Sequence, residues 1–289
     1  MTKPKLLIQL DPDEHASVFD AVVAADSGVD HLLQYHRVQP DQVRDLIHGA
    51  IFTRGPKDLH QTAVFVGGTD VAAGEALLDA VTRSFFGPLR VSVMMDSNGA
   101  NTTAAAAVLT AAGHLPLSEA RALVLAATGP VGSRVVHLLA REGAQVSVAS
   151  RQLKRAAQVC RDVSQRVAGA RLDPVATTAE ETVSEALAQS NLLIAAGAAG
   201  IQLIAAREWS DSSRLRVAID LNAVPPVGIE GIEATARNVE TNQIACYGAI
   251  GVGGTKMKIH KAALTGLFQA NDRVLDAEEV YAIGQQLMG

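Results

Sequence analysis

The chain has 289 residues, of which 48% are apolar, 19% charged and 3% aromatic, and a formal net charge of −5. This length allows two domains, and the composition is that of a globular protein whose core is built from Ala, Val, Leu and Ile. The negative charge offers no general attraction to nucleic acid or anionic membranes, so we expect neither as a partner. Cys160 and Cys246 fit no metal-ligand spacing, and no metal site is predicted. The apolar run near the N-terminus is too short for a signal peptide or membrane span, which favours a soluble, cytoplasmic protein.

Strand and helix patterns alternate along the first part of the chain. Strands are predicted over residues 5–11, 29–36, 50–54, 63–68 and 90–96, and helices over residues 17–25, 40–48, 70–85 and 101–112. This alternation predicts an α/β fold with a mostly parallel sheet that helices cover on both faces. Ligands of such sheets bind beyond the carboxyl ends of the strands.

The polar stretch 96–103, which contains Asp96, Asn98 and Thr103, follows one of these strand ends. Its short polar residues are also those that cap helices, so the pattern leaves a cap and a ligand contact equally open. Phe19 begins a helix after another strand end and fits either a cleft or the core. Arg54 and Lys57 could meet a substrate acid, although a basic surface turn is favoured.

A dinucleotide-binding pattern begins after residue 115. Strands are predicted over residues 122–127, 145–150, 171–177, 191–196 and 216–221. The first of them leads into a glycine turn and a helix, and the turn consists of Thr128, Gly129, Pro130, Val131 and Gly132. Ala127 stands at the first glycine position of the fingerprint G-x-G-x-x-G. The helix start after such a turn binds an anion, usually the pyrophosphate of a dinucleotide.

The end of the next strand indicates which dinucleotide binds. NAD enzymes usually carry an acid there for the ribose 2′-hydroxyl, whereas this chain has Ser150 and Arg151, with Arg155 one helical turn later. A hydroxyl and a guanidinium group bind a 2′-phosphate, which a carboxylate would repel. NADP is therefore predicted, with NAD as the second choice. The later strand ends place Ala196–Gly197 and Asn222 on the cofactor side of the sheet.

A glycine-rich run at residues 248–254 precedes Lys256 and His260. We interpret the run as a hinge or as a segment that approaches a ligand. Lys256 and His260 share one helix face, and a catalytic pair and two surface groups remain equally open. A final helix with the capping pattern Asp-x-x-Glu begins near Asp276 and is expected to pack on the first domain.

Together these motifs resemble the NADP-dependent methylene-tetrahydromethanopterin dehydrogenases of bacterial one-carbon metabolism. The resemblance spans nearly the whole chain and is carried by residues 17–20, 51–55, 65–68, 85–88, 96–105, 128–132, 222–226 and 256–260. The block at 96–105, Asp-Ser-Asn-Gly-Ala-Asn-Thr-Thr-Ala-Ala, is far more specific than any glycine pattern. Two departures are Ala127, in place of a glycine, and Phe52, where a tyrosine can occur.

The resemblance implies an oxidoreductase that transfers a hydride from the methylene carbon of the reduced pterin to NADP, with methylene-tetrahydrofolate accepted by some members. It implies an α/β substrate domain (residues 1–112 with 270–289) and a Rossmann-type NADP-binding domain (residues 113–269). Thr103, Lys256 and His260 are the implied catalytic residues. Phe19 is the implied substrate contact, and we place Asp96 and Asn98 beside it. The family is oligomeric, and a neighbouring subunit partly completes the cleft.

Two other functions remain open from the sequence. One is a shikimate- or alanine-dehydrogenase-like enzyme, which would need a cationic clamp for a carboxylated substrate. The other is a non-catalytic NADP-binding sensor, which would bind NADP tightly without turning over a pterin or folate.

Overall fold

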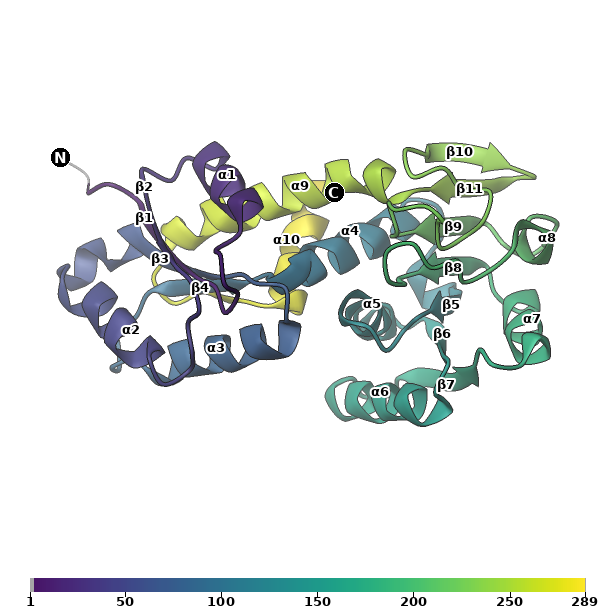
Figure 1. The fold of residues 1–289 in the computed structure, drawn as a ribbon, viewed down its shortest axis with the longest axis horizontal. Coiled ribbons are helices and arrows are strands. Elements are labelled where there is room, and N and C mark those ends of the chain that lie inside the picture. The colour runs from purple at the N-terminus through teal and green to yellow at the C-terminus, as the bar shows by residue number, and fades with distance from the viewer. Residues whose placement is uncertain (1–2, 289) are drawn as a thin grey trace. The chain divides into compact units, whose positions relative to one another are not determined.

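The computed structural model of the protein describes residues 3–288 (Figure 1). The chain divides into two compact units. The first consists of the residues up to Thr102 and of Met257–Leu287, and the second of Thr103–Lys256. Helices α4 (Ala100–Ala112) and α9 (Ala249–Gly266) each contribute to both units. The domain boundaries expected at 112 and 270 lie at the end of α4 and beyond the end of α9.

The first unit contains a five-stranded parallel sheet in the order β12-β4-β3-β1-β2. Its strands are β1 (Leu6–Leu10), β2 (His31–Tyr35), β3 (Thr62–Val66), β4 (Ser92–Met95) and β12 (Val274–Leu275). Helices α2 (Val43–Phe52) and α3 (Val71–Arg83) cover one face, and α1 (Val18–Asp26) and α9 the other (Figure 1). The chain ends with α10 (Ala277–Met288), which belongs to this unit as expected, and the Asp276 N–H donates to Glu279 Oε2 at 3.1 Å.

The strand predicted over residues 50–54 is wrong, because α2 continues to Phe52. Its buried residues are Val43, Ile47, Ala50 and Ile51. Their spacing of three and four residues places them on one helix face, and this burial outweighs the strand preference of Ile51 and Phe52. The residues that follow form a short 3₁₀ helix, Pro56–Gln61.

The second unit contains a seven-stranded sheet in the order β10-β11-β9-β8-β5-β6-β7, in which only the pairing of β10 with β11 is antiparallel. The parallel strands are β5 (Arg121–Leu125), β6 (Gln145–Ser150), β7 (Arg171–Ala176), β8 (Leu192–Ala195) and β9 (Val217–Asp220). Helices α5 (Pro130–Arg141) and α6 (Leu153–Arg166) lie on one face, and α7 (Glu180–Ala188) and α8 (Ala206–Trp209) on the other (Figure 1). The predicted α/β fold with two parallel-dominated sheets is confirmed.

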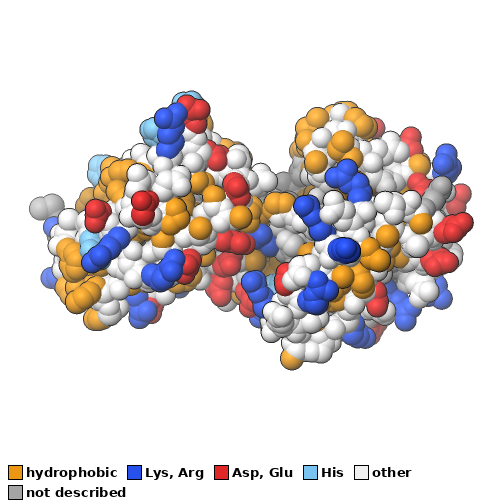
Figure 2. All heavy atoms as spheres, turned by 60° about the horizontal axis from the view of Figure 1, so that its bottom comes forward, with side chains coloured by type: hydrophobic (Ala, Val, Ile, Leu, Met, Phe, Trp, Pro, Cys, Tyr) orange, Lys and Arg blue, Asp and Glu red, His pale blue; other side chains and the backbone are white. Residues whose placement is uncertain are grey.

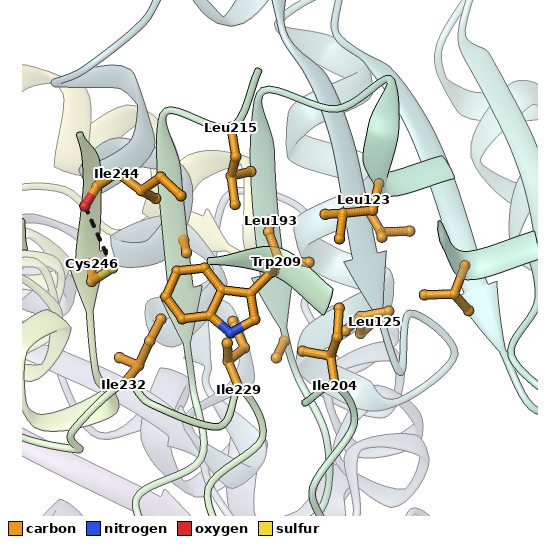
Figure 3. Close-up of a cluster of buried hydrophobic side chains, with 14 of the residues drawn as sticks. Leu123, Leu125, Leu193, Ile204, Trp209, Leu215, Ile229, Ile232, Ile244 and Cys246 are labelled. Carbon is orange, nitrogen blue, oxygen red and sulfur yellow. Dashed lines mark hydrogen bonds between the residues drawn. The ribbon is translucent and has the colours of Figure 1, made fainter. Parts of the chain in front are cut away.

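Trp209, the single tryptophan of the chain, lies at the centre of the apolar core of this unit (Figure 3). Its indole is 1% exposed and donates from Nε1 to the Glu230 carbonyl at 3.0 Å. Aliphatic side chains from β5, β8 and the segments beside β9 surround it. This packing fixes the sheet whose carboxyl edge carries the residues considered below.

The glycine-rich run is not a hinge loop, because α9 begins at Ala249 and includes most of it. A Cβ added to Gly248 would lie 2.1 Å from the Glu233 carbonyl oxygen, and one added to Gly251 would lie 1.8 Å from that of Ala236. These two glycines therefore let the start of α9 pack against the backbone of residues 233–237. Among the described residues, no helix has the length and apolar character needed to cross a bilayer.

Candidate functional site

The glycine turn of the second unit connects β5 to α5. Ala126 adopts a left-handed conformation with φ of 54°, and the Gly129 N–H donates to its carbonyl at 3.1 Å. A Cβ on Gly132 would lie 2.6 Å from the same carbonyl oxygen, so only glycine fits there. At Gly129 the nearest atom to an added Cβ is 3.5 Å away, which is ordinary contact. Gly132 thus serves the packing of helix on strand. Gly129 is partly exposed, and its contacts do not require a glycine.

Ser150 and two arginines lie beside this turn at the end of β6. Thr128 Oγ1 and Ser150 Oγ are 3.3 Å apart, and the Gln152 N–H donates to Ser150 Oγ at 3.3 Å. Arg151 and Arg155 are exposed, and α6 begins without a side-chain cap. Figure 2 brings the α6 side of the molecule forward and shows Lys and Arg side chains distributed over it. Hydroxyls and exposed guanidinium groups therefore lie where an NAD enzyme usually has its acid.

The later strand ends hold Ala196, Gly197 and Asn222. The Ala196 N–H donates to the Leu125 carbonyl at 3.1 Å, which keeps this segment beside the turn. A Cβ on Gly197 would lie 2.8 Å from Leu203 Cδ1, so this glycine makes room for a neighbouring side chain.

Asn222 is 3% exposed, and its amide is used inside its own loop. Nδ2 donates to the Pro226 carbonyl at 3.1 Å, and Oδ1 accepts from the Val224 N–H at 2.9 Å. Asp220 supports the loop by accepting from the backbone N–H groups of Asn222 and Ile229. Burial raises the pKa of the Asp220 carboxyl, an effect that these hydrogen bonds oppose. The side chain of Asn222 thus shapes the loop that follows β9.

The first unit brings three of the predicted residues into one cluster, which also includes Phe65. His260, on α9, is 1% exposed, and its ring stacks on Phe65 with centroids 5.7 Å apart. Phe19 tilts against the same imidazole at 6.3 Å and is itself 52% exposed. His260 Nδ1 lies 3.7 Å from Asp96 Oδ2. We call these four residues the histidine cluster; it combines an aromatic ring at the surface with a buried imidazole and carboxylate.

The stretch 96–103 forms a short 3₁₀ helix, Ser97–Gly99, and the first turn of α4. Asp96 accepts hydrogen bonds from the N–H groups of Asn101 and Thr102 and from the Thr102 hydroxyl. Asn98 is exposed and left-handed, with φ of 55°, and its N–H donates to the Gly68 carbonyl. Thr103 follows on α4 and is partly buried, as is Lys256, one turn before His260 on α9. The sequence left a helix cap and a ligand contact open for this stretch, and the structure shows the cap, formed by Asp96.

Three further residues near the histidine cluster were not identified from the sequence. One is Phe65, on which the imidazole of His260 stacks. The other two are Asp11 and Asp20, whose carboxylates both lie near Gly67. A Cβ on Gly67 would lie 3.3 Å from Asp11 Oδ2 and 3.1 Å from Asp20 Oδ2. Asp11 directly follows β1, so its place at the carboxyl end of a strand could have identified it, whereas Phe65 lies inside a hydrophobic strand and has no such position.

The second unit also has a groove of about 410 Å³ between β6, β7 and α7. Polar pairs span it, with Gln145 Nε2 donating to Asp173 Oδ2 and Arg121 Nη1 to Gln189 Oε1. The site residues predicted from the sequence are not among its lining residues. Within residues 3–288, no group of three His, Cys, Asp or Glu side chains could hold a metal ion.

The fold and the glycine turn define the class of protein, a two-domain chain of the type found in nicotinamide-dependent dehydrogenases. Quinate dehydrogenase from Corynebacterium glutamicum, in complex with NAD, superposes with a TM-score of 0.57 at 11% identity, over 98% of this chain and 99% of that one. Shikimate 5-dehydrogenase from Listeria monocytogenes, in complex with shikimate and NAD, gives 0.55 at 14% identity, over 99% and 96%. At these identities the likeness concerns the fold alone.

Sequence comparison is more specific. A profile of the family "Methylene-tetrahydromethanopterin dehydrogenase, N-terminal" matches residues 18–98. The bifunctional protein MdtA of Methylorubrum extorquens is 43% identical over 98% of this chain and 99% of its own length. The NAD(P)-dependent methylenetetrahydromethanopterin dehydrogenase of the same organism is 29% identical over the same shares. The chain belongs to the methylene-tetrahydromethanopterin dehydrogenase family, as its motifs indicated.

Proposed function

We propose that the protein oxidises methylene-tetrahydromethanopterin, and also methylene-tetrahydrofolate, to the methenyl form, with NADP as hydride acceptor. The observation that carries the proposal is the end-to-end relationship to enzymes of this family in a chain that has both a dinucleotide turn and the histidine cluster. We assign the cofactor to the second unit and the pterin to the first. Such an enzyme needs no metal, because the reaction is a hydride transfer between two organic molecules.

The residues around the glycine turn fit NADP. The uncapped start of α5 and the open side of Gly129 suit a pyrophosphate, with Thr128, Pro130, Val131 and Gly132 completing the turn. Ser150, Arg151 and Arg155 suit the 2′-phosphate, and the absence of an acid from this strand end favours NADP over NAD. Ala196, Gly197 and Asn222 would line the nicotinamide side, with Asn222 acting through the shape of its loop.

The reaction makes modest demands on the side chains. Two nitrogens flank the methylene carbon, and their lone pairs help to expel the hydride, so no proton transfer has to accompany it. NADP supplies the hydride acceptor when bound. The protein holds the two reacting carbons in line and excludes water. Phe19 packs on the pterin, Thr103 and Lys256 contact its polar edge, and His260 orients it.

Asp96 and Asn98, which follow β4, differ in their suitability as substrate contacts. Asn98 is exposed and free to meet the substrate, whereas Asp96 is 2% exposed and already accepts three hydrogen bonds. We therefore retain Asn98 as a substrate contact and give Asp96 an indirect role. We also infer a cytoplasmic homo-oligomer whose cleft lies near a subunit interface, acting without nucleic acid or membrane, on the basis of the family and the charge.

The proposal predicts that Lys256→Ala and His260→Ala lower kcat/KM for methylene-tetrahydromethanopterin by at least about 100-fold. The measurement is a spectrophotometric assay of the methenyl product with NADP. Lys258→Ala is the matched control, because Lys258 lies on the same helix, is exposed and points away from the face that Lys256 and His260 share. Near-wild-type values for both alanine variants would show that the site is misplaced. NADP binding without turnover of either the pterin or the folate would refute the proposed enzymatic function.

A further inference from the structure

The hydrogen bonds of Asp96 hold its carboxylate within the protein rather than at a substrate. Its side chain is 0% exposed, and both carboxylate oxygens are used by α4. Oδ1 accepts from the N–H groups of Asn101 at 2.9 Å and Thr102 at 3.0 Å, and Oδ2 accepts from Thr102 Oγ1 at 2.6 Å. The carboxylate is therefore fixed in position by the helix that carries Thr103.

The same carboxylate faces the imidazole of His260. Oδ2 lies 3.7 Å from Nδ1, which is an ion-pair distance rather than a short hydrogen bond. Stacking on Phe65 and the tilted ring of Phe19 restrict rotation of the imidazole plane. An unprotonated Nδ1 would direct its lone pair at an anionic oxygen, so this arrangement favours a proton on Nδ1.

A proton on Nδ1 determines what the other ring nitrogen can do. In a neutral imidazole with the proton on Nδ1, Nε2 is an acceptor with a lone pair. The proposed reaction leaves a methenyl cation, beside which a lone pair is favourable and an N–H or a charged ring is unfavourable.

We propose that Asp96 is a positioning residue for the hydride transfer, which it serves by holding His260 as the neutral Nδ1–H tautomer, in which Nε2 carries a lone pair rather than a proton. This proposal rests on the proposed function for the role of His260 at the substrate. One carboxylate then sets both the start of α4, next to Thr103, and the imidazole on α9.

The first test is the tautomer of His260 in the wild-type, NADP-loaded protein, measured by nitrogen NMR with histidine labelling. The resonance is assigned by its loss in His260→Gln. We expect the neutral Nδ1–H form near neutral pH. A neutral Nε2–H form or an imidazolium would overturn the proposal, and this measurement depends on no variant of Asp96.

The second test is Asp96→Asn, which keeps the size of the side chain and removes the anionic acceptor. We expect a shift of His260 towards the Nε2–H tautomer and a decrease of kcat on the order of 100-fold, with the KM for NADP unchanged. A folded Asp96→Asn protein with an unchanged tautomer would overturn the proposal, even if its kcat were lower.

Thr102→Val is the matched control, because it removes the hydroxyl donor to the same Oδ2 but keeps the carboxylate. It should lower stability and leave the His260 spectrum as in the wild type. If the wild type turns over no pterin or folate, the proposed function fails, whereas the NMR measurements still test the pairing of Asp96 with His260. The two failures are thus distinguishable.

Discussion

At the scale of single residues, we attribute the choice between NADP and NAD to a short segment at the end of β6. Ser150 is held near Thr128 by the 3.3 Å contact of their hydroxyls, while Arg151 and Arg155 remain exposed. We propose that this buried hydroxyl and the two exposed guanidinium groups bind a phosphate. The 2′-phosphate is the group by which NADP differs from NAD, so these side chains should affect the two cofactors unequally.

Arg151→Ala should raise the KM for NADP about tenfold or more and leave the KM for NAD nearly unchanged. A hydrogen bond to a charged group contributes about 1.5–3 kcal/mol, and only NADP carries the phosphate that receives it. Initial rates with both cofactors provide the measurement. Arg161→Ala, on the exposed side of the same helix, controls for the loss of one positive charge. An equal loss with both cofactors would place the 2′-phosphate elsewhere.

The sequence identified the chemistry of individual residues better than their roles. Phe19 and His260 were selected by a strand end and a helix face, and they lie against each other. Asp96 and Asn222 were selected by the same strand-end rule, yet both are buried and use their side chains to hold backbone. A short polar residue after a strand serves a cap as well as a ligand, and only burial and hydrogen-bond partners distinguish the two.

At the scale of elements, the start of α9 shows how tertiary packing determines a glycine-rich sequence. Gly248 and Gly251 bring the helix against the backbone of residues 233–237, whereas an added Cβ at Gly253 would meet no described atom within 4 Å. The glycine pattern alone cannot distinguish a glycine that packs closely from one that does not, because the contacting residues 233–237 lie outside the glycine-rich run. β10 (Arg237–Thr241) and β11 (Ile244–Tyr247) were not predicted from the sequence. β10 is almost entirely exposed and thus lacks the alternation of a half-buried strand.

Gly251→Ala should destabilise the protein by about 1–3 kcal/mol, because the new methyl group would overlap the Ala236 carbonyl and force the backbone to shift. Gly253→Ala should instead stabilise it by about 0.5–1 kcal/mol, since alanine is the better residue within a helix and has room there. Denaturant unfolding of both variants measures the difference. Equal effects of the two substitutions would show that α9 does not pack on residues 233–237 in solution.

At the scale of the whole molecule, each of the two units has its own sheet. The alternation of strands and helices predicted both sheets, because a parallel sheet requires a crossover helix between its strands. Segments that join a sheet from far along the chain were harder to predict. β12 adds to β4 from the C-terminal end, and Ser92 Oγ donates to the Ala270 carbonyl there at 2.8 Å.

The two parts of the site should respond separately to their ligands. NADP at a hundredfold excess over its Kd stabilises the folded protein by about 2.7 kcal/mol, provided that it binds only the folded state. Hydrogen exchange measured by mass spectrometry should show that NADP protects residues 126–133 and 150–156 from exchange. NAD at the same concentration should protect residues 150–156 less than NADP does. A reduced pterin, tetrahydromethanopterin or tetrahydrofolate, should protect residues 17–21 and 256–260, around Phe19 and His260. If the pterin protected only the groove between β6, β7 and α7, the assignment of the pterin to the first unit would be contradicted. If NADP protected this groove but not the glycine turn, the assignment of the cofactor to the turn would be contradicted.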